Sequence, residues 1–128
     1  MPAGPKDESV FPPDERLSKR ERLRGEREFA RLRRYGKRKS SKHLVLLYEI
    51  EGARPAFGIA VGRRVGGAVG RSLVRRRIRE SYRRSKWALR PACMLFIARY
   101  GITRLSQLEL NEEMKELWCR AGLWRGRD

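Results

Sequence analysis

Residues 62–87 read GRRVGGAVGRSLVRRRIRESYRRSKW, and this stretch decides how the rest of the chain is interpreted. Positions 62–70 form a glycine-rich loop, and the sequence predicts a helix from about residue 68 to residue 87. The loop lacks the lysine and hydroxyl pattern of a P-loop, so it does not predict a nucleotide site. One side of the helix is apolar or small, which is typical of a face that packs on a sheet. The residues of this face are Val74, Ile78, Ser81, Tyr82 and Ser85.

The neighbouring flank of this helix carries a band of cations, with Arg71 at its edge and no acidic residue expected within it. The members of the band are Arg75, Arg76, Arg79, Arg83 and Lys86, with Ser72 among them. Side chains three or four positions apart lie about 5–6 Å from one another, which is comparable to the spacing of phosphates along a strand. Repulsion between such like charges costs roughly a few tenths of a kcal/mol per pair, which favours a binding role over an ordinary solvated face.

The elements around this helix predict a small α+β fold. A helix at 26–35 ends before Gly36, and residues 37–42 form a loop or a short edge strand. Strands are predicted at 43–50, 56–61 and 93–99. The last helix begins with a capping box of Ser106 and Glu109, and Gly122 follows its end. Its apolar stripe consists of Leu110, Met114, Leu117, Trp118 and Ala121. We therefore expect three helices packed on a sheet of three to four strands.

Two of the strands predict which faces of the sheet are covered. Residues 43–50 (HLVLLYEI) are too continuously apolar for a strand with one wet face, so both faces should be buried. In residues 56–61, Phe57, Ile59 and Val61 point to one side, and Ala56, Gly58 and Ala60 point to the other. The large side predicts the core. The small side fits either a close approach of a ligand to the backbone or tight packing of a helix.

The chain is strongly basic, with 32 Lys and Arg against 15 Asp and Glu and a net charge of +17 on 128 residues. The cations fall in two clusters, at 16–42 and 63–90. Arginine dominates both clusters, and its planar guanidinium suits phosphate oxygens. The composition therefore predicts a polyanionic partner, and nucleic acid is favoured over a membrane surface because no basic segment has a long apolar face.

The length of the chain allows one core, so we expect a single RNA-binding domain at 16–123. Residues 1–15 are proline-rich without periodicity and predict a disordered arm, and 124–128 predict a C-terminal tail. No run of about 18 apolar residues spans a membrane, and no secretory signal opens the sequence, so a cytoplasmic protein is expected. Cys93 and Cys119 are expected to be reduced and buried. The lone His43 predicts a surface residue without a metal-binding or general-base role, and Glu80, Glu112 and Glu113 are expected to form no catalytic pair with it.

The segment from Arg63 to Glu80 resembles the signature of the bacterial ribonuclease P protein component, which typically reads K-K-x-G-N-A-V-x-R-N-R-x-K-R-x-x-R-E. The resemblance extends to the helix at 23–36 and on to Gly122, about 100 residues in all. Three positions depart from the signature. Gly67 and Ser72 stand where asparagine is usual, and Leu73 replaces an arginine.

The resemblance implies a fold like the second domain of ribosomal protein S5, with a left-handed strand–helix–strand crossover. It also implies a protein subunit of an endoribonuclease, with no catalytic residue and no metal ligand in this chain. In the family, an RNA subunit carries the active site and its Mg²⁺ ions, and the holoenzyme hydrolyses a phosphodiester to release the 5′ leader of precursor tRNA. The implied partners are that RNA and the leader, with no membrane and no obligate protein partner.

The family pattern assigns two groups of site residues. Those expected to bind the RNA subunit are Arg63, Arg64, Gly66, Arg71, Ser72, Arg75, Arg76, Arg79 and Arg83. Those expected to bind the leader are Phe29, Arg33, Val45, Leu47, Arg64 and Ala98. From its position, Phe29 fits stacking on a base and packing in the core equally well.

Two other classes of protein share this basic composition. A ribosomal protein would bind RNA but leave leader removal unaffected, and a DNA-compacting protein would not need the glycine loop and arginine helix. A nuclease acting without RNA would need acidic residues that hold a metal, and the sequence offers no such set.

Overall fold

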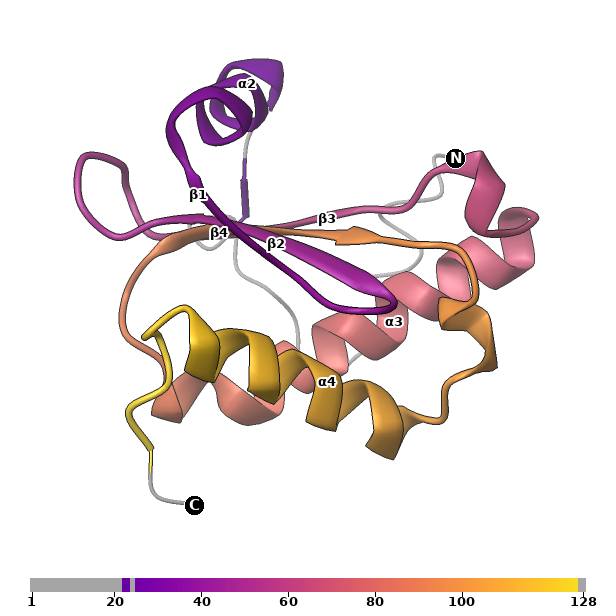
Figure 1. Cartoon of the computed structure of the whole chain (residues 1–128). Helices are drawn as coiled ribbons and strands as arrows, with labels where there is room; N and C mark the ends of the chain where they lie inside the picture. Colours follow the sequence, from indigo (N-terminus) through magenta and orange to yellow (C-terminus); the bar gives the residue numbers. More distant parts are fainter. Residues whose placement is uncertain (1–21, 24, 127–128) are drawn as a thin grey trace.

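The computed structural model describes residues 22–23 and 25–126, so the predicted arm at 1–15 lies outside the described residues. The helices are α2 (Gly25–Tyr35), α3 (Ala68–Ser85) and α4 (Gln107–Arg120), and the strands are β1 (Lys37–Ser40), β2 (Leu44–Glu49), β3 (Ala56–Ala60) and β4 (Cys93–Ala98). Three short 3-10 turns complete the described part: η2 (Arg63–Val65), η3 (Lys86–Ala88) and η4 (Ile102–Arg104). The predicted order of elements is confirmed, and the basic segment after α2 is an edge strand (Figure 1).

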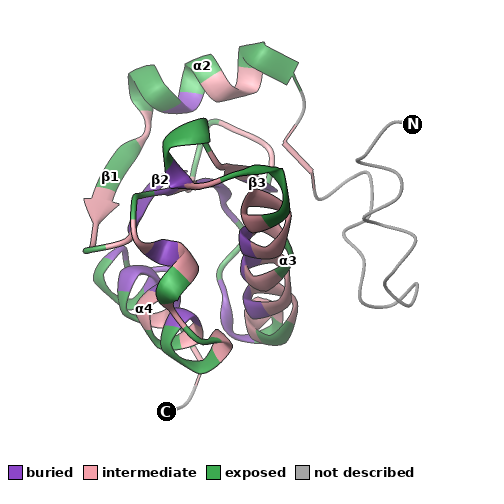
Figure 2. Ribbon diagram, turned by 90° about the vertical axis from the view of Figure 1, so that its right-hand side faces the viewer, coloured by how far each residue is buried: buried purple, intermediate pink, exposed green. Residues whose placement is uncertain are grey.

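The four strands form one mixed sheet in the order β1-β2-β4-β3. β2 runs antiparallel to β1 and β4, whereas β3 pairs with β4 in parallel. A parallel pair needs a crossover, and α3 supplies it below the sheet. The two ribbon views agree that the β3–α3–β4 connection is left-handed, whereas such connections are usually right-handed (Figures 1 and 2). This is the fold that the family resemblance implies.

Helices cover both faces of the sheet. α2 lies alone on one face, and α3 and α4 lie side by side on the other (Figure 2). The larger core lies under α3 and α4, and the smaller core lies under α2. β2 is buried on both faces, as its continuous apolar sequence predicts. In β3, Phe57 enters the larger core and Ala56 the smaller one, so the small side of this strand serves helix packing.

The ends of the helices follow the local signals in the sequence. The Ser106 hydroxyl accepts a hydrogen bond from the Glu109 amide at 3.1 Å, and the Glu109 carboxylate accepts one from the Ser106 amide at 2.9 Å. Gly122 adopts a φ of +76° after α4, which favours glycine. Gly36 follows the end of α2, as the sequence predicts, and its φ is not positive. A Cβ there would lie 2.5 Å from the Leu32 carbonyl oxygen, so close packing requires glycine.

The C-terminal residues of the described part lie against the domain. Leu89 and Trp124 form an isolated antiparallel bridge, and the Arg125 amide donates to the Ala88 carbonyl at 2.7 Å. The ring of Trp124 stacks near that of the fully buried Trp118, with centroids 6.3 Å apart. The segment expected as a tail from residue 124 therefore packs on the larger core as far as Gly126.

The two cysteines differ in their surroundings. Cys93 is buried in the smaller core, and this burial raises the pKa of its thiol to about 11. Cys119 is exposed on α4, so the prediction that both cysteines are buried is wrong for this one. Cys119 lies outside the apolar stripe of α4. The buried residues of this helix are Leu110, Met114, Leu117 and Trp118. Both thiols are free. Within the described ranges, no helix has the length and apolar character needed to cross a lipid bilayer.

Candidate nucleic-acid interface

The face of α3 that packs on the sheet is the one the sequence predicts. Val74, Ile78 and Ser81 are buried, and Tyr82 is half-buried with its ring stacked on Phe57 at a centroid distance of 4.0 Å. This packing fixes the rotation of the helix about its axis. The basic flank is therefore held toward solvent by the core beneath it.

The basic band on α3 contains an acidic contact that the sequence pattern does not predict. The Arg83 guanidinium donates to the two Glu80 carboxylate oxygens at 3.1 and 2.8 Å, and Arg84 Nε donates at 2.6 Å. The prediction that no acid enters the band is thus wrong, because residues three and four positions apart meet on a helix. Mainly through the hydrogen bond from Arg83, these contacts hold the pKa of Glu80 below its ordinary value. Arg83 is consequently less available to a phosphate than Arg76, which is exposed.

The remaining predicted band residues lie along the same flank. Ser72, Arg75 and Arg79 are half-buried. A shallow surface depression nearby is lined by residues from the first turns of α3, and its members are Ala68, Val69, Ser72, Leu73 and Arg76. Val69 is 86% exposed, so the first turns of α3 present apolar atoms beside the cations.

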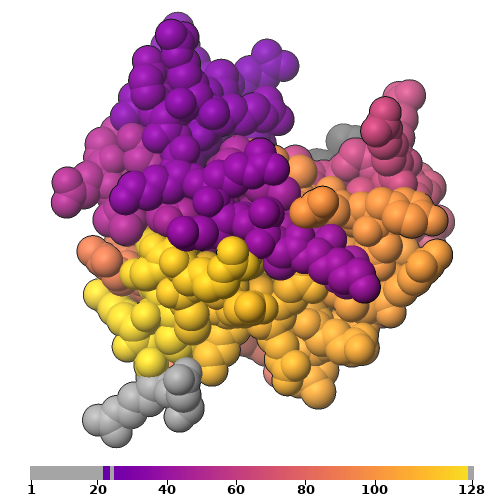
Figure 3. Space-filling model, viewed as in Figure 1, coloured from indigo at the N-terminus to yellow at the C-terminus, as the bar shows by residue number. Residues whose placement is uncertain are grey.

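The glycine-rich loop is held close to the start of α3. Arg71 Nη1 donates to the Gly66 carbonyl oxygen at 2.9 Å, which directs this arginine to the loop and gives it a positioning role there. Arg63 and Arg64 lie exposed on η2, which stands out from the body of the protein (Figure 3). A Cβ on Gly70 would lie 3.7 Å from the Thr103 methyl group, so η4 supports the loop from below.

The opposite face of the sheet carries the predicted leader residues. Phe29 of α2 is half-buried against the smaller core, to which Val45 and Leu47 of β2 contribute. Arg33 is exposed on α2, and Arg64 is exposed on η2. The space-filling view shows a hollow between α2 and η2 on this face, which we call the α2 cleft (Figure 3). Phe29, Arg33 and Arg64 lie on the two elements that border the cleft, whereas Val45 and Leu47 are buried in the smaller core beneath α2.

Ala98 does not lie in this cleft. It is buried in the larger core, on the α3 and α4 side, because alternate residues of β4 face opposite sides of the sheet. Its neighbour Ile97 is half-buried on the α2 side and pairs with Val45. Side chains alternate between the two faces along residues 93–98. Once one residue of this strand is assigned to a face, the alternation therefore places Ile97, and not Ala98, on the α2 side.

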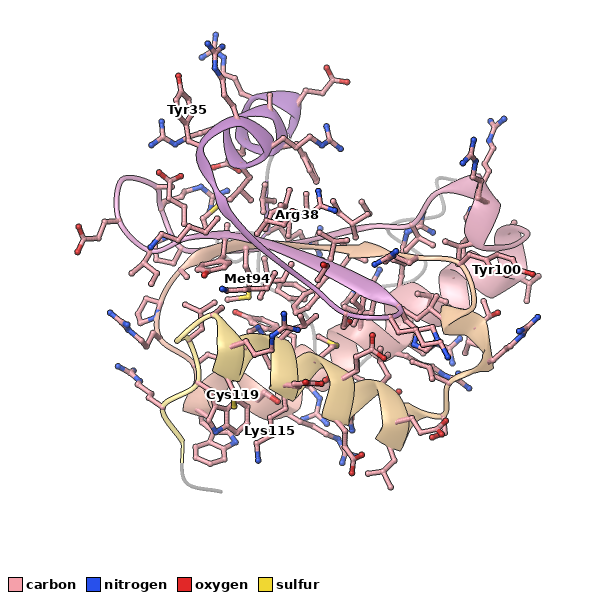
Figure 4. The ribbon with its side chains drawn as sticks, viewed as in Figure 1. Tyr35, Arg38, Met94, Tyr100, Lys115 and Cys119 are labelled. Atoms are coloured by element: carbon pink, nitrogen blue, oxygen red, sulfur yellow. The ribbon has the colours of Figure 1, made fainter. Side chains whose placement is uncertain are left out.

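Arg38 is a second residue of the cleft that the sequence pattern does not reveal. It pairs with Leu47 across β1 and β2, and paired residues share a face of the sheet. Figure 4 shows Arg38 above the sheet, on the side of α2. This face thus combines the half-buried side chains of Phe29 and Ile97 with arginines from α2, β1 and η2. The sequence shows that residues 37–42 are basic, but it does not give the register of β1 against β2, which determines the face on which Arg38 lies.

His43 is also placed differently from the prediction. It is half-buried, and its ring Nδ1 donates to Glu113 at 2.9 Å while its backbone amide donates to the same carboxylate at 2.8 Å. The Ser41 hydroxyl donates to this carboxylate as well. Burial alone would raise the pKa of Glu113, but these hydrogen bonds outweigh it and hold the pKa below its ordinary value. The prediction of a surface histidine is therefore wrong, because a carboxylate of α4, 70 positions away, holds the ring in a half-buried position.

This cluster fastens α4 to the turn between β1 and β2. Ser41 and His43 both donate to the carboxylate, so they do not form the nucleophile–base chain of a hydrolase. Within residues 22–23 and 25–126, no three His, Cys, Asp or Glu side chains lie together in a group that could hold a metal. The described surface thus offers groups for binding a polyanion.

The fold and these cationic surfaces define a small RNA-binding protein of the α+β class. The sequence model of the Ribonuclease P family matches residues 17–122. The chain belongs to this family, as a ribonuclease P protein component.

Curated relatives and solved structures agree with this assignment. The chain is 31% identical over 111 residues to the ribonuclease P protein component of Exiguobacterium, covering 85% of this chain and 96% of the relative. It is 35% identical over 117 residues to that of Dictyoglomus turgidum, covering 88% and 93%. The RNase P protein of Thermotoga maritima superposes with a TM-score of 0.71 at 29% identity, covering 79% and 97%. The Staphylococcus aureus protein shares the fold, with a TM-score of 0.74 at 22% identity, covering 81% and 97%.

Proposed function

We propose that this chain is the protein subunit of a ribonuclease P holoenzyme that removes the 5′ leader of precursor tRNA. In this proposal, the RNA subunit binds to η2 and the basic flank of α3. The 5′ leader binds in the α2 cleft. The RNA subunit, with its Mg²⁺ ions, hydrolyses the phosphodiester, and this chain positions the substrate. Its residues have no bond-breaking role.

One observation carries the proposal. η2 stands between the α2 cleft on one face of the sheet and the start of α3 on the other. Arg63 and Arg64 on η2 can therefore contact RNA on either side. One small domain can then hold two RNA segments at once, which is what a protein that joins a substrate leader to a folded RNA requires.

The α2 cleft suits a single strand. The half-buried side chains of Phe29 and Ile97 can contact base or ribose surfaces, while Arg33 and Arg38 can bind phosphates. Single strands bind through such a combination of stacking and backbone charge, with little dependence on sequence. A deep nucleotide pocket with specific hydrogen bonds would predict a different ligand.

Sequence departures at the RNA-subunit surface alter its chemistry. Ser72 can donate one hydrogen bond but cannot make the paired contacts of an asparagine amide, and Leu73 lacks a cation. Arg75 and Arg76 on adjacent turns supply positive charge beside them. We infer that docking here depends more on phosphate contacts than on a specific asparagine.

The experiment mixes this protein with a bacterial ribonuclease P RNA at low Mg²⁺ and follows release of the 5′ leader from precursor tRNA. We expect strong stimulation, because the protein's cations offset repulsion between the two RNAs when Mg²⁺ is scarce. RNA binding without stimulation would favour a ribosomal protein and contradict the proposal. Cleavage by the protein without the RNA would contradict it as well.

A further inference from the structure

Trp87 is exposed at the end of α3 that lies away from η2. It is the central residue of η3, and its side chain is 69% exposed. The other two tryptophans differ from it, since Trp118 is fully buried and Trp124 is half-buried. A large apolar ring at a solvent-exposed position points to a binding role when the ring is also held in place and its surroundings suit one ligand.

The C-terminal segment holds the Trp87 ring in place. The rings of Trp87 and Trp124 meet edge to face, with centroids 6.4 Å apart. A Cβ on Gly126 would lie 3.2 Å from the Trp87 ring, so the backbone of Gly126 packs directly against it. The bond from the Arg125 amide to the Ala88 carbonyl fixes this segment beside η3. The ring therefore presents its exposed surface without a large loss of conformational freedom on binding.

Cations flank Trp87 along the chain and in the C-terminal segment that packs on its ring, since Lys86 precedes it and Arg125 lies between Trp124 and Gly126. The residues on either side of Trp87 and the C-terminal segment contribute arginine and lysine, and we call this set with the ring the Trp87 patch. Its members are Trp87, Lys86, Arg90 and Arg125. Lys115 of α4 lies 5.0 Å from the centroid of the Trp124 ring, and Figure 4 shows it on this side of the sheet. A flat aromatic surface among cations suits an unpaired nucleobase, whose ring stacks while its phosphates pair with the cations.

We propose that Trp87 stacks on an unpaired base of RNA bound along α3. The 18 residues of α3 span about 27 Å. The Trp87 patch would thus extend the RNA footprint well beyond the glycine-rich loop. This inference rests on the proposed function in naming the ribonuclease P RNA as the source of the base. The chemistry at the patch, an unpaired base in single-stranded RNA, does not depend on that name.

The test compares full-length wild type with Trp87→Ala, Trp87→Phe and Leu108→Ala. Leu108 is 67% exposed on α4 and serves as a matched control for removal of an exposed apolar side chain. Affinity is measured for the ribonuclease P RNA and for a ten-nucleotide single-stranded RNA. Loss of stacking on one base predicts a roughly 5- to 150-fold weaker affinity for Trp87→Ala, with an unchanged salt slope. Trp87→Phe, which keeps a ring, should lose less, and Leu108→Ala should match wild type.

Tryptophan emission provides a second readout that does not depend on folding of the alanine variant. RNA should quench emission from wild type, and the quenching should be much smaller in Trp87→Phe, because Trp118 is fully buried and Trp124 is half-buried. Unchanged affinity in Trp87→Ala together with the same quenching in Trp87→Phe would overturn the inference. So would an altered oligomeric state with unaltered RNA affinity, which would mark a protein contact. If the short RNA shows the effects and the ribonuclease P RNA does not bind, the proposed function fails and the stacking site stands.

Discussion

Replacing Glu80 by glutamine tests whether the basic flank of α3 faces RNA. Glu80 accepts three hydrogen bonds from Arg83 and Arg84, at 2.6–3.1 Å. Because its pKa lies below the ordinary value, Glu80 is ionised at neutral pH and glutamine removes a full negative charge. The amide is nearly the same size as the carboxylate. The change therefore alters charge within the band with little effect on packing.

The expected gain follows from Coulomb's law. A charge removed about 8 Å from an RNA phosphate changes their interaction by roughly 0.5–2 kcal/mol at an effective dielectric constant between 80 and 20. RNA affinity should rise about two- to 30-fold. If one released guanidinium then neutralises a further phosphate, the slope of log affinity against log salt steepens by about 0.9. Removing the surface ion pairs should cost only about 0–1 kcal/mol of stability, since Arg84 is largely exposed.

The assay titrates the ribonuclease P RNA with each variant over a series of salt concentrations. Glu116→Gln is the matched control, because Glu116 is exposed on α4 and its replacement changes the net charge equally. We expect Glu80→Gln to bind more tightly than this control and with a steeper slope. Equal affinities and slopes for the two variants would refute the reasoning, since the gain would then come from overall charge.

Three further predictions concern other parts of the molecule. Phe29→Ala should leave binding of the RNA subunit intact but weaken binding of leader-bearing precursor relative to mature tRNA by about 1–3 kcal/mol; equal losses for both RNAs would mark Phe29 as a core residue only. Glu113→Gln should lower the free energy of unfolding at neutral pH by about 1–3 kcal/mol in denaturant titrations. Because the pKa of Glu113 is lowered on folding, its contribution is present above the ordinary value of 4.5 and is lost as pH falls through the folded value; denaturant titrations should show wild type and variant converging in acid, and a constant difference would contradict this assignment. A thiol reagent at about pH 8 should modify Cys119 quickly and Cys93 only after unfolding, because burial raises the pKa of Cys93 to about 11; two fast thiols would disprove it.

The elements that the sequence predicts best are those with strong local signals. The capping box at Ser106 and the apolar stripe after it define α4 without any long-range information. The continuous apolar run of β2 likewise predicts burial on both faces. Helical periodicity alone places Val74 and Ile78 on the buried face of α3. Each of these depends on a period or a cap that the chain carries within about a dozen residues.

Side-chain partners are predicted least well. The contact of His43 with Glu113 joins residues 70 positions apart, and local pattern carries no such information. The position of Ala98 depends on the absolute face assignment of β4, and a shift of one residue reverses it. The hydrogen bonds from Arg83 to Glu80 depend on the rotamers of both side chains. The position of Glu80 around the helix axis lies outside the basic band, so the helical pattern alone does not predict this contact. The hand of the β3–α3–β4 crossover follows from the family resemblance, since periodicity does not distinguish the two hands.

The most direct test of the account is the salt dependence of binding between the ribonuclease P RNA and a variant with Arg75, Arg76 and Arg79 replaced by alanine. Every RNA phosphate that no longer meets an arginine should reduce the slope of log affinity against log salt by about 0.9. The triple variant should therefore bind weakly and with a slope lower by up to about 3. Retained folding is checked by thermal unfolding. If the triple variant showed the same slope as wild type, the claim that this flank of α3 binds the RNA subunit would be contradicted.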